Sequence, residues 1–138
     1  MLRNILSCSL FMIVLSLANP TYAHSNHYSG HHDEQVELTM KKMQRAYRAA
    51  LRSDNIEQLK PAVAQLIEVT RQASVLHYGI NAREHTQYQT GMRQLRTDLE
   101  QLRVAVVADD FVLAKKILHG QIKATRQQSH DKLGVERD

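Results

Sequence analysis

Apolar residues recur along residues 33–134 at steps of three and four, which is the spacing of amphipathic helices. The first apolar stripe lies in residues 33–53 and consists of Val36, Met40, Met43, Tyr47 and Ala50. Asp54-Asn55 follows it, a pair suited to end one helix and to cap the next. The second stripe consists of Ile56, Leu59, Val63, Leu66, Thr70, Ala73 and His77. Pro61 lies inside this stretch and predicts either a kink or a delayed helix start.

The second half of the chain repeats the same spacing. A connection is predicted at residues 79–84, because it begins with a glycine, which commonly ends helices. The third stripe consists of Tyr88, Met92, Leu95, Leu99, Leu102 and Val106. Asp109-Asp110 separates it from a fourth, whose apolar residues are Phe111, Ala114, Ile117, Leu118 and Ile122. Gly120 lies inside this last helix, where glycine costs about 1 kcal/mol relative to alanine unless a close contact uses it. We expect the last helix to end near Gly134.

Short connections place consecutive helices antiparallel. The pattern therefore predicts an all-α fold, an up-down-up-down antiparallel four-helix bundle formed by residues 33–134. The absence of tryptophan and the single proline within this range favour helices over a sheet. The length of this segment is that of one domain.

The first 23 residues have the organisation of a secretory signal peptide. Arg3 supplies the positive charge, residues 5–18 form the apolar region, and Thr21-Tyr22-Ala23 supplies small residues for cleavage after Ala23. The protein is therefore expected in the periplasm. Residues 24–32, which follow the predicted cleavage site, have no helical periodicity and are expected to form a flexible tail.

Charge and cysteine content narrow the function further. Arg3 is the only charged residue of the predicted signal peptide, so 17 basic and 14 acidic residues remain after cleavage. This small excess is interspersed with acids, which argues against nucleic-acid binding. The only cysteine, Cys8, lies in the signal peptide, so disulfides and thioether-linked haem are both excluded from the mature chain. We expect a monomer that does not bind a membrane once residues 1–23 are removed.

The candidate chemistry gathers at one end of the predicted bundle. The start of the first helix and the end of the fourth meet there, so the Met40 thioether can face the His130 imidazole. These groups form an axial pair that can hold a haem iron, six-coordinate and suited to electron transfer. His77 is expected at the same end. The residues that can line a flat macrocycle there are Met43, Tyr47, Tyr88 and Met92, and Arg126 can pair with one of its carboxylates or lie against the ring. In the alternative interpretation, Met40 is core packing and His130 complements a helix terminus.

A second candidate site is the predicted tail, which contains His24, His27, His31 and His32. A flexible histidine cluster in the periplasm can bind zinc, copper or nickel weakly, although a solvated tail is the simpler interpretation. The predicted helices contain no paired carboxylates, Ser-His-Asp set, phosphate loop or zinc motif, so we expect no enzyme.

Three segments resemble the periplasmic cytochrome b562 family. Met40 precedes Asp54-Asn55 by the separation that the family has between its methionine ligand and first interhelical turn. Thr125-Arg126-x-x-x-His130-x-Lys132 is similar to the family's C-terminal motif, whose histidine is the other ligand. Tyr88-x-x-Gly91-Met92 resembles an aromatic-x-x-Gly-Phe segment that lines the haem. The similarity runs from about Val36 to Lys132.

The resemblance implies a periplasmic electron-transfer protein with one non-covalent b-type haem, ligated by Met40 and His130, and an unidentified redox partner protein. The chain differs from the family at Met92, where phenylalanine is usual, and at Ser129, where an aromatic residue precedes the histidine. In the family, a terminal arginine would approach a haem propionate, whereas this chain has residues 134–138, Gly-Val-Glu-Arg-Asp, at that place. The alternative function is a cofactor-free periplasmic helical binding or stress protein, whose histidine-rich tail is a candidate metal site.

Overall fold

The computed structural model describes residues 30–134, and all regular structure in this range is helical. The helices are α1 (Gly30–Arg52), α2 (Ile56–Ala73), α3 (Ala82–Val107), and a fourth that comprises α4 (Phe111–Ile117), the π-turn η1 (Leu118–Ile122) and α5 (Lys123–Leu133). The predicted all-α class is therefore confirmed, and the four helices are consistent with a four-helix bundle. The predicted signal peptide, His24 and His27 lie outside the described residues, as do the last four residues of the chain.

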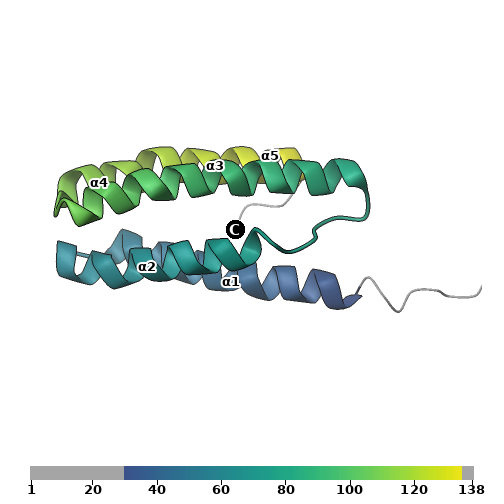
Figure 1. Ribbon diagram of the computed structural model, residues 1–138, viewed down its shortest axis with the longest axis horizontal. Helices are drawn as coiled ribbons and strands as arrows, with labels where there is room; N and C mark the ends of the chain where they lie inside the picture. Colours follow the sequence, from purple (N-terminus) through teal and green to yellow (C-terminus); the bar gives the residue numbers. More distant parts are fainter. Residues whose placement is uncertain (1–29, 135–138) are drawn as a thin grey trace, which may run out of the picture.

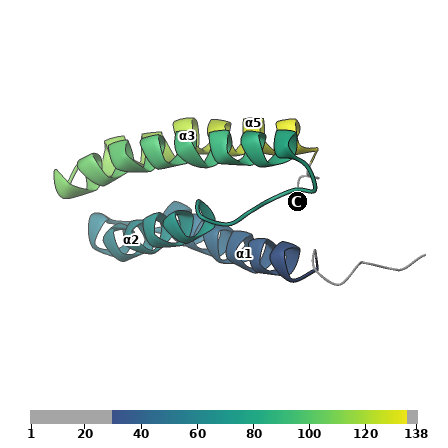
Figure 2. The same cartoon turned by 45° about the vertical axis from the view of Figure 1, so that its right-hand side comes forward.

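The helices form two layers, one of α1 and α2 and one of α3 with α4 and α5 (Figure 1). α2 also packs against α3, which joins the layers. The layers lie close together where α4 begins and diverge toward the end where α1 begins (Figure 2). One end is therefore closed by direct helix packing, and the other is wider.

The core is built from the predicted apolar stripes. The largest fully buried side chains are Tyr88, Leu59, Leu66, Leu102, Leu118, Val63 and Thr70. Each buried leucine contributes about 1.5–3 kcal/mol relative to an exposed one, so these layers are held mainly by apolar burial.

Predicted caps define two of the helix starts. The Gln58 amide donates to Asn55 Oδ1 at 2.9 Å, and the Leu113 amide donates to Asp110 Oδ1 at 2.9 Å. α2 begins at Ile56 although Pro61 lies inside it, so the delayed start was wrong.

The end of α2 differs from the prediction. The helix ends at Ala73, so His77 is not on its apolar stripe but in a connection that covers residues 74–81 rather than 79–84. At this end the Tyr88 hydroxyl donates to the Ala73 carbonyl at 2.6 Å, and the Leu76 amide donates to the same carbonyl at 3.1 Å. The carbonyl that a longer helix would pair with the His77 amide is therefore already occupied.

α3 begins earlier than predicted because Asn81 caps it and the Glu84 carboxylate bonds back to the connection. The Glu84 amide donates to Asn81 Oδ1 at 3.0 Å, while Glu84 Oε2 accepts from the Ile80 amide at 2.9 Å. Gly79 has φ +85°, and a Cβ there would lie 2.5 Å from Glu84 Cβ. The turn therefore requires glycine, although it lies inside the connection and not at a helix end.

Two further boundaries differ. α1 begins at Gly30, three residues before the predicted start at Asp33, because nothing in this segment interrupts the helical backbone; the predicted tail is thus helical from Gly30, which includes His31 and His32. The fourth helix is not continuous α-helix, because it contains η1. Within the described part of the chain, no helix is long and apolar enough to cross a membrane.

Candidate functional site

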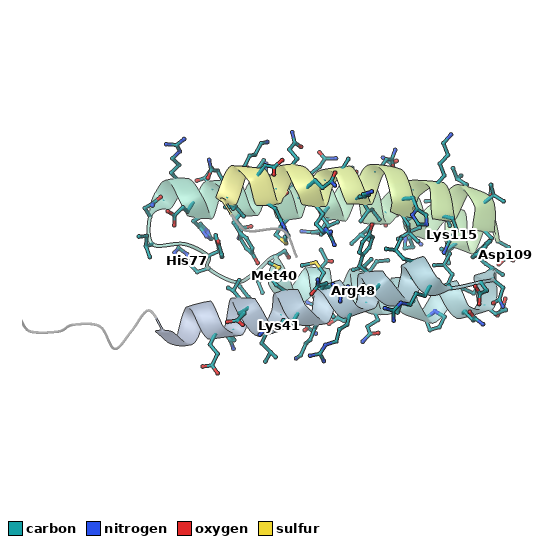
Figure 3. The ribbon with its side chains drawn as sticks, turned by 180° about the vertical axis from the view of Figure 1, so that it is seen from behind. Met40, Lys41, Arg48, His77, Asp109 and Lys115 are labelled. Carbon is teal, nitrogen blue, oxygen red and sulfur yellow. The ribbon has the colours of Figure 1, made fainter. Side chains whose placement is uncertain are left out.

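The closed end is fastened by Lys115 of α4. Its ammonium donates to the carbonyl oxygens of Leu51 and Ser53, the latter at 3.0 Å, and so caps the C-terminal end of α1. Figure 3 shows Lys115 and Asp109 toward this end, and Met40 and His77 toward the other. α1 is therefore held against the fourth helix at the end away from Met40.

The next link between α1 and the fourth helix is Tyr47. Its hydroxyl donates to the Leu118 carbonyl at 3.0 Å, and the Arg126 Cζ lies 5.5 Å from its ring centroid. Burial raises the pKa of the Tyr47 phenol, an effect that the neighbouring Arg126 partly opposes. Tyr47 therefore fixes the axial position of α1 against both η1 and α5.

Met40 and His130 lie beyond this link. Met40 precedes Tyr47 by seven residues, or two helical turns, so both lie on the side of α1 that faces the fourth helix. His130 follows Arg126 by four residues and therefore shares the side of α5 that faces Tyr47. Both Met40 and His130 are half-buried, and Met40 packs against the core. The sides of α1 and α5 that carry them thus face each other.

The other candidate sulfur, Met43, faces a different helix. Its side chain is buried, and the Thr70 hydroxyl of α2 lies 3.3 Å from its sulfur. The same hydroxyl donates to the Leu66 carbonyl at 2.8 Å. Met43 is therefore packed between α1 and α2.

Tyr88 and Met92 are buried on α3, as their stripe predicts. The Tyr78 ring, in the connection before α3, stacks on Tyr88 with centroids 5.1 Å apart. Burial raises the pKa of Tyr88 to about 12, and the neighbouring Tyr78 adds to the shift. His77 is exposed and stacks on His85 with centroids 4.1 Å apart, so it belongs to the connection and not to the apolar wall.

α5 is also fixed against α3. Asp98 is buried, and its carboxylate accepts from the Thr125 hydroxyl at 2.5 Å. One turn further along α5, Ser129 lies so near Gly91 that a Cβ on Gly91 would meet Ser129 Oγ at 2.7 Å. Thr125 and Ser129 therefore mark the side of α5 that faces α3.

The Arg126 side chain has a buried hydrogen-bond donor that is not used within the described residues. Its Nε is buried and has no hydrogen-bond partner among the described residues. A buried donor without a partner costs about 1–3 kcal/mol, so a ligand that supplies an acceptor there would be favoured. This set of groups fits a haem, which requires axial ligands and carries two carboxylates. The Met40 thioether and the His130 imidazole would hold the iron, and the unused Arg126 donor would pair with a carboxylate.

The family model for cytochrome b562 matches residues 35–133, nearly all of the described chain. The chain belongs to the cytochrome b562 family. A comparison with curated proteins gave no match. The family is one of haem-binding, electron-transfer helical proteins rather than enzymes, and membership implies a b-type haem as the cofactor of this cytochrome b562 homologue.

Sequence reasoning missed several residues of this end of the cytochrome b562 homologue. Thr70 lies on the predicted stripe of α2, but the stripe does not indicate its contact with the Met43 sulfur, and Tyr78 lies on no stripe. The π-turn does leave one, because Leu118, Ile122, Arg126 and His130 are separated by three successive steps of four. Such steps drift by about 40° each in an α-helix, and only a local change of helical period keeps these residues on one side.

Proposed function

We propose that the chain is a periplasmic electron-transfer protein that binds one b-type haem non-covalently, with Met40 and His130 as axial ligands. The observation that carries this proposal is the contact of Arg126 with Tyr47, because helical spacing puts His130 one turn from Arg126 and Met40 two turns from Tyr47 on the same sides of α5 and α1. Family membership supports the cofactor.

The ligand chemistry supports electron transfer. Imidazole nitrogen is a strong ligand for iron, and thioether sulfur favours the reduced metal. With both axial positions filled by protein, the haem supplies a one-electron couple and has no open position for oxygen. His130 and Met40 then need only keep their positions as the oxidation state changes.

Further residues are proposed to bind the haem. Tyr47, Tyr88 and Met92 are buried side chains that can form the walls, and Met43 supports the Met40 side from within the core. Arg126 is proposed to donate through its unused Nε to a propionate.

We infer an up-down-up-down antiparallel order of the helices. Support comes from the short connections and from the packing of α1 on α2, α2 on α3, and α3 on α4 and α5. This order brings the start of α1 and the end of α5 to one end, as the proposed ligand pair requires.

Attachment, location and partners complete the proposal. Non-covalent binding is supported by the sequence after Ala23, which contains no cysteine. Periplasmic location is supported by the signal-peptide pattern of residues 1–23. We propose a monomer that exchanges electrons with a partner protein and binds neither nucleic acid nor, after cleavage, a membrane.

The proposal is tested by titrating haem into protein purified from the periplasm and recording oxidised and reduced absorption spectra. We expect saturation at one haem per chain with low-spin, six-coordinate bands in both states. Acidic butanone should extract all the haem. Haem that stays with the polypeptide, or a protein that gives no Soret band after haem addition, contradicts the proposal.

A further inference from the structure

We propose that the π-turn η1, held by the Tyr47 hydroxyl, rotates α5 so that Arg126 and His130 face α1. Tyr47 is then a positioning residue for His130. The role of His130 as a ligand rests on the proposed function. The rotation itself is a property of the chain that can be measured without haem.

The rotation follows from counting residues. Leu118 is fully buried, and His130 lies twelve residues after it. At about 100° per residue, twelve residues of α-helix would turn His130 about 120° away from the side of Leu118. A π-turn holds about one additional residue, which takes back about 100°. His130 therefore returns to within about 20° of the buried side.

Burial on both sides of η1 agrees with this count. Up to the first residue of the turn, the buried residues of the fourth helix are Ala114, Ile117 and Leu118. After it, the half-buried residues of α5 are Thr125, Arg126, Ser129, His130 and Leu133. In an uninterrupted α-helix the centres of these two sets would differ by about a quarter of a turn. The π-turn keeps both sets directed toward the core.

The Tyr47 hydroxyl supplies a reason for the turn to lie at this position. Where the bonding of a helix changes from four-residue to five-residue spacing, the regular pairing of carbonyls is disturbed. The Leu118 carbonyl, in the first residue of η1, accepts the buried Tyr47 hydroxyl at 3.0 Å. This bond therefore stabilises η1 from α1, the helix toward which His130 must be turned.

Gly120 does not explain the turn. It lies within η1 but is exposed, and a Cβ placed on it would meet nothing within 4 Å. Its φ is not in the left-handed region, so neither packing nor backbone conformation demands glycine. Gly120→Ala is therefore a matched control: it keeps the number of residues, whereas deletion of Gly120 removes the additional one.

The first test measures rotation without haem. Because Cys8 is the only cysteine and precedes the predicted cleavage site, Met40→Cys with His130→Cys gives a mature chain with two thiols. A short bis-maleimide should link them efficiently in this background and in Gly120→Ala. Deletion of Gly120 should lower the yield at least fivefold while helical content is retained. Equal yields in the deletion and the control overturn the proposal.

Two further variants keep the test decisive if the deletion fails to fold. Tyr47→Phe removes only the hydroxyl and should lower the cross-linking yield two- to threefold; an unchanged yield contradicts the role of Tyr47. Deletion of Gly120 with one alanine inserted after Lys123 restores the residue count and should restore the yield. If this variant folds but is not cross-linked, the number of residues between Leu118 and His130 does not set the direction of His130, and the proposal is contradicted.

The second test uses the native ligands and haem. Gly120→Ala should keep the low-spin, six-coordinate spectrum, and deletion of Gly120 should lose it in favour of a five-coordinate one. A deletion variant that keeps the six-coordinate spectrum overturns the proposal. If the wild-type chain binds no haem but the cross-linking pattern is as expected, the proposed function fails and the positioning role of η1 stands.

Discussion

The guanidinium carbon of Arg126 lies 5.5 Å from the centroid of the Tyr47 ring, and this contact joins α1 to α5. A cation over an aromatic face contributes about 0.5–2 kcal/mol, more when water is excluded. The contact uses the π-face of Tyr47, while the hydroxyl of the same ring is bonded to Leu118. One side chain of α1 therefore fixes two segments of the fourth helix, and Arg126 still has its Nε unused.

The unused Nε predicts opposite effects of one substitution in the two states of the protein. Arg126→Met keeps most of the side-chain length but removes the buried donor. The substitution removes the contact with Tyr47, worth about 0.5–2 kcal/mol, but it also removes an unsatisfied buried donor that costs about 1–3 kcal/mol. We therefore expect the haem-free protein to unfold at the same or a slightly higher urea concentration. Haem affinity should fall about tenfold, since one charge-assisted hydrogen bond is worth about 1.4 kcal/mol or more. Urea titration and haem titration measure the two effects, and a parallel loss in both contradicts the role of Arg126 as a propionate donor.

The different neighbours of the two methionines predict which sulfur binds iron. Met40→Ala should abolish the six-coordinate spectrum, because Met40 is on the side of α1 that faces α5. Met43→Leu should preserve it, because the Met43 sulfur lies 3.3 Å from the Thr70 hydroxyl on α2. The matched control is Thr70→Val, which removes that hydroxyl and should leave the spectrum unchanged. Loss of six-coordination in Met43→Leu but not in Met40→Ala would reverse the assignment.

Residue spacing was sufficient to predict the helices but not all of their ends. The stripe that continues to His77 suggested a longer α2, yet the Ala73 carbonyl is occupied by the Leu76 amide and by the hydroxyl of Tyr88, fifteen residues later. A tertiary hydrogen bond of this kind has no local signature. Asn55 and Asp110 act on their own helices within three residues, and their caps were predicted correctly.

The site was predictable only in part for a related reason. Periodicity places Met40 and Met43 on one broad stripe, and only the contact with Thr70 separates their directions. The approach of Gly91 to Ser129 depends on the rotation of α5, which in turn depends on a π-turn. Such a turn appears in the sequence merely as steps of four.

The approach of α3 to α5 predicts a pair of compensating substitutions. In Gly91→Ala the new Cβ would lie 2.7 Å from Ser129 Oγ and 3.2 Å from Ser129 Cβ. Because rotation of the hydroxyl relieves only the first contact, we expect a loss of about 1–3 kcal/mol in unfolding free energy. Ser129→Gly in the same chain should recover most of it, beyond what Ser129→Gly does alone. A double-mutant cycle by urea unfolding measures the coupling, and purely additive effects would mean that the helices are not in contact there.

The raised pKa of Tyr88 predicts how stability depends on alkaline pH. The folded-state pKa is about 12, whereas an unfolded tyrosine titrates near 10. Its contribution is therefore fully present below about pH 10 and is lost as the pH rises toward about 12, to a limit of roughly 3 kcal/mol. Tyr88→Phe should be less stable at pH 8 by about 1 kcal/mol, because the buried hydrogen bond from the hydroxyl to the Ala73 carbonyl is lost and only the Leu76 amide still donates there. It should also show a flatter decline above pH 10 in urea titrations; an unchanged slope contradicts the shift.

Haem binding should stabilise the chain through its two ends. Met40 and His130 come from the first and last helices of the described chain, so a haem held by both orders α1 against α5. Binding only to the native state adds about 2.7 kcal/mol at a free haem concentration one hundred times the Kd. His130→Ala should therefore melt close to the haem-free protein, whereas Ser129→Ala, a neighbouring change on the α3 side, should keep most of the haem-dependent increase in melting temperature.

Hydrogen exchange should show that residues 126–133 gain more protection from haem than residues 111–117, which Lys115 already holds against α1. Equal gains in both segments would mean that the end of α5 does not hold the cofactor.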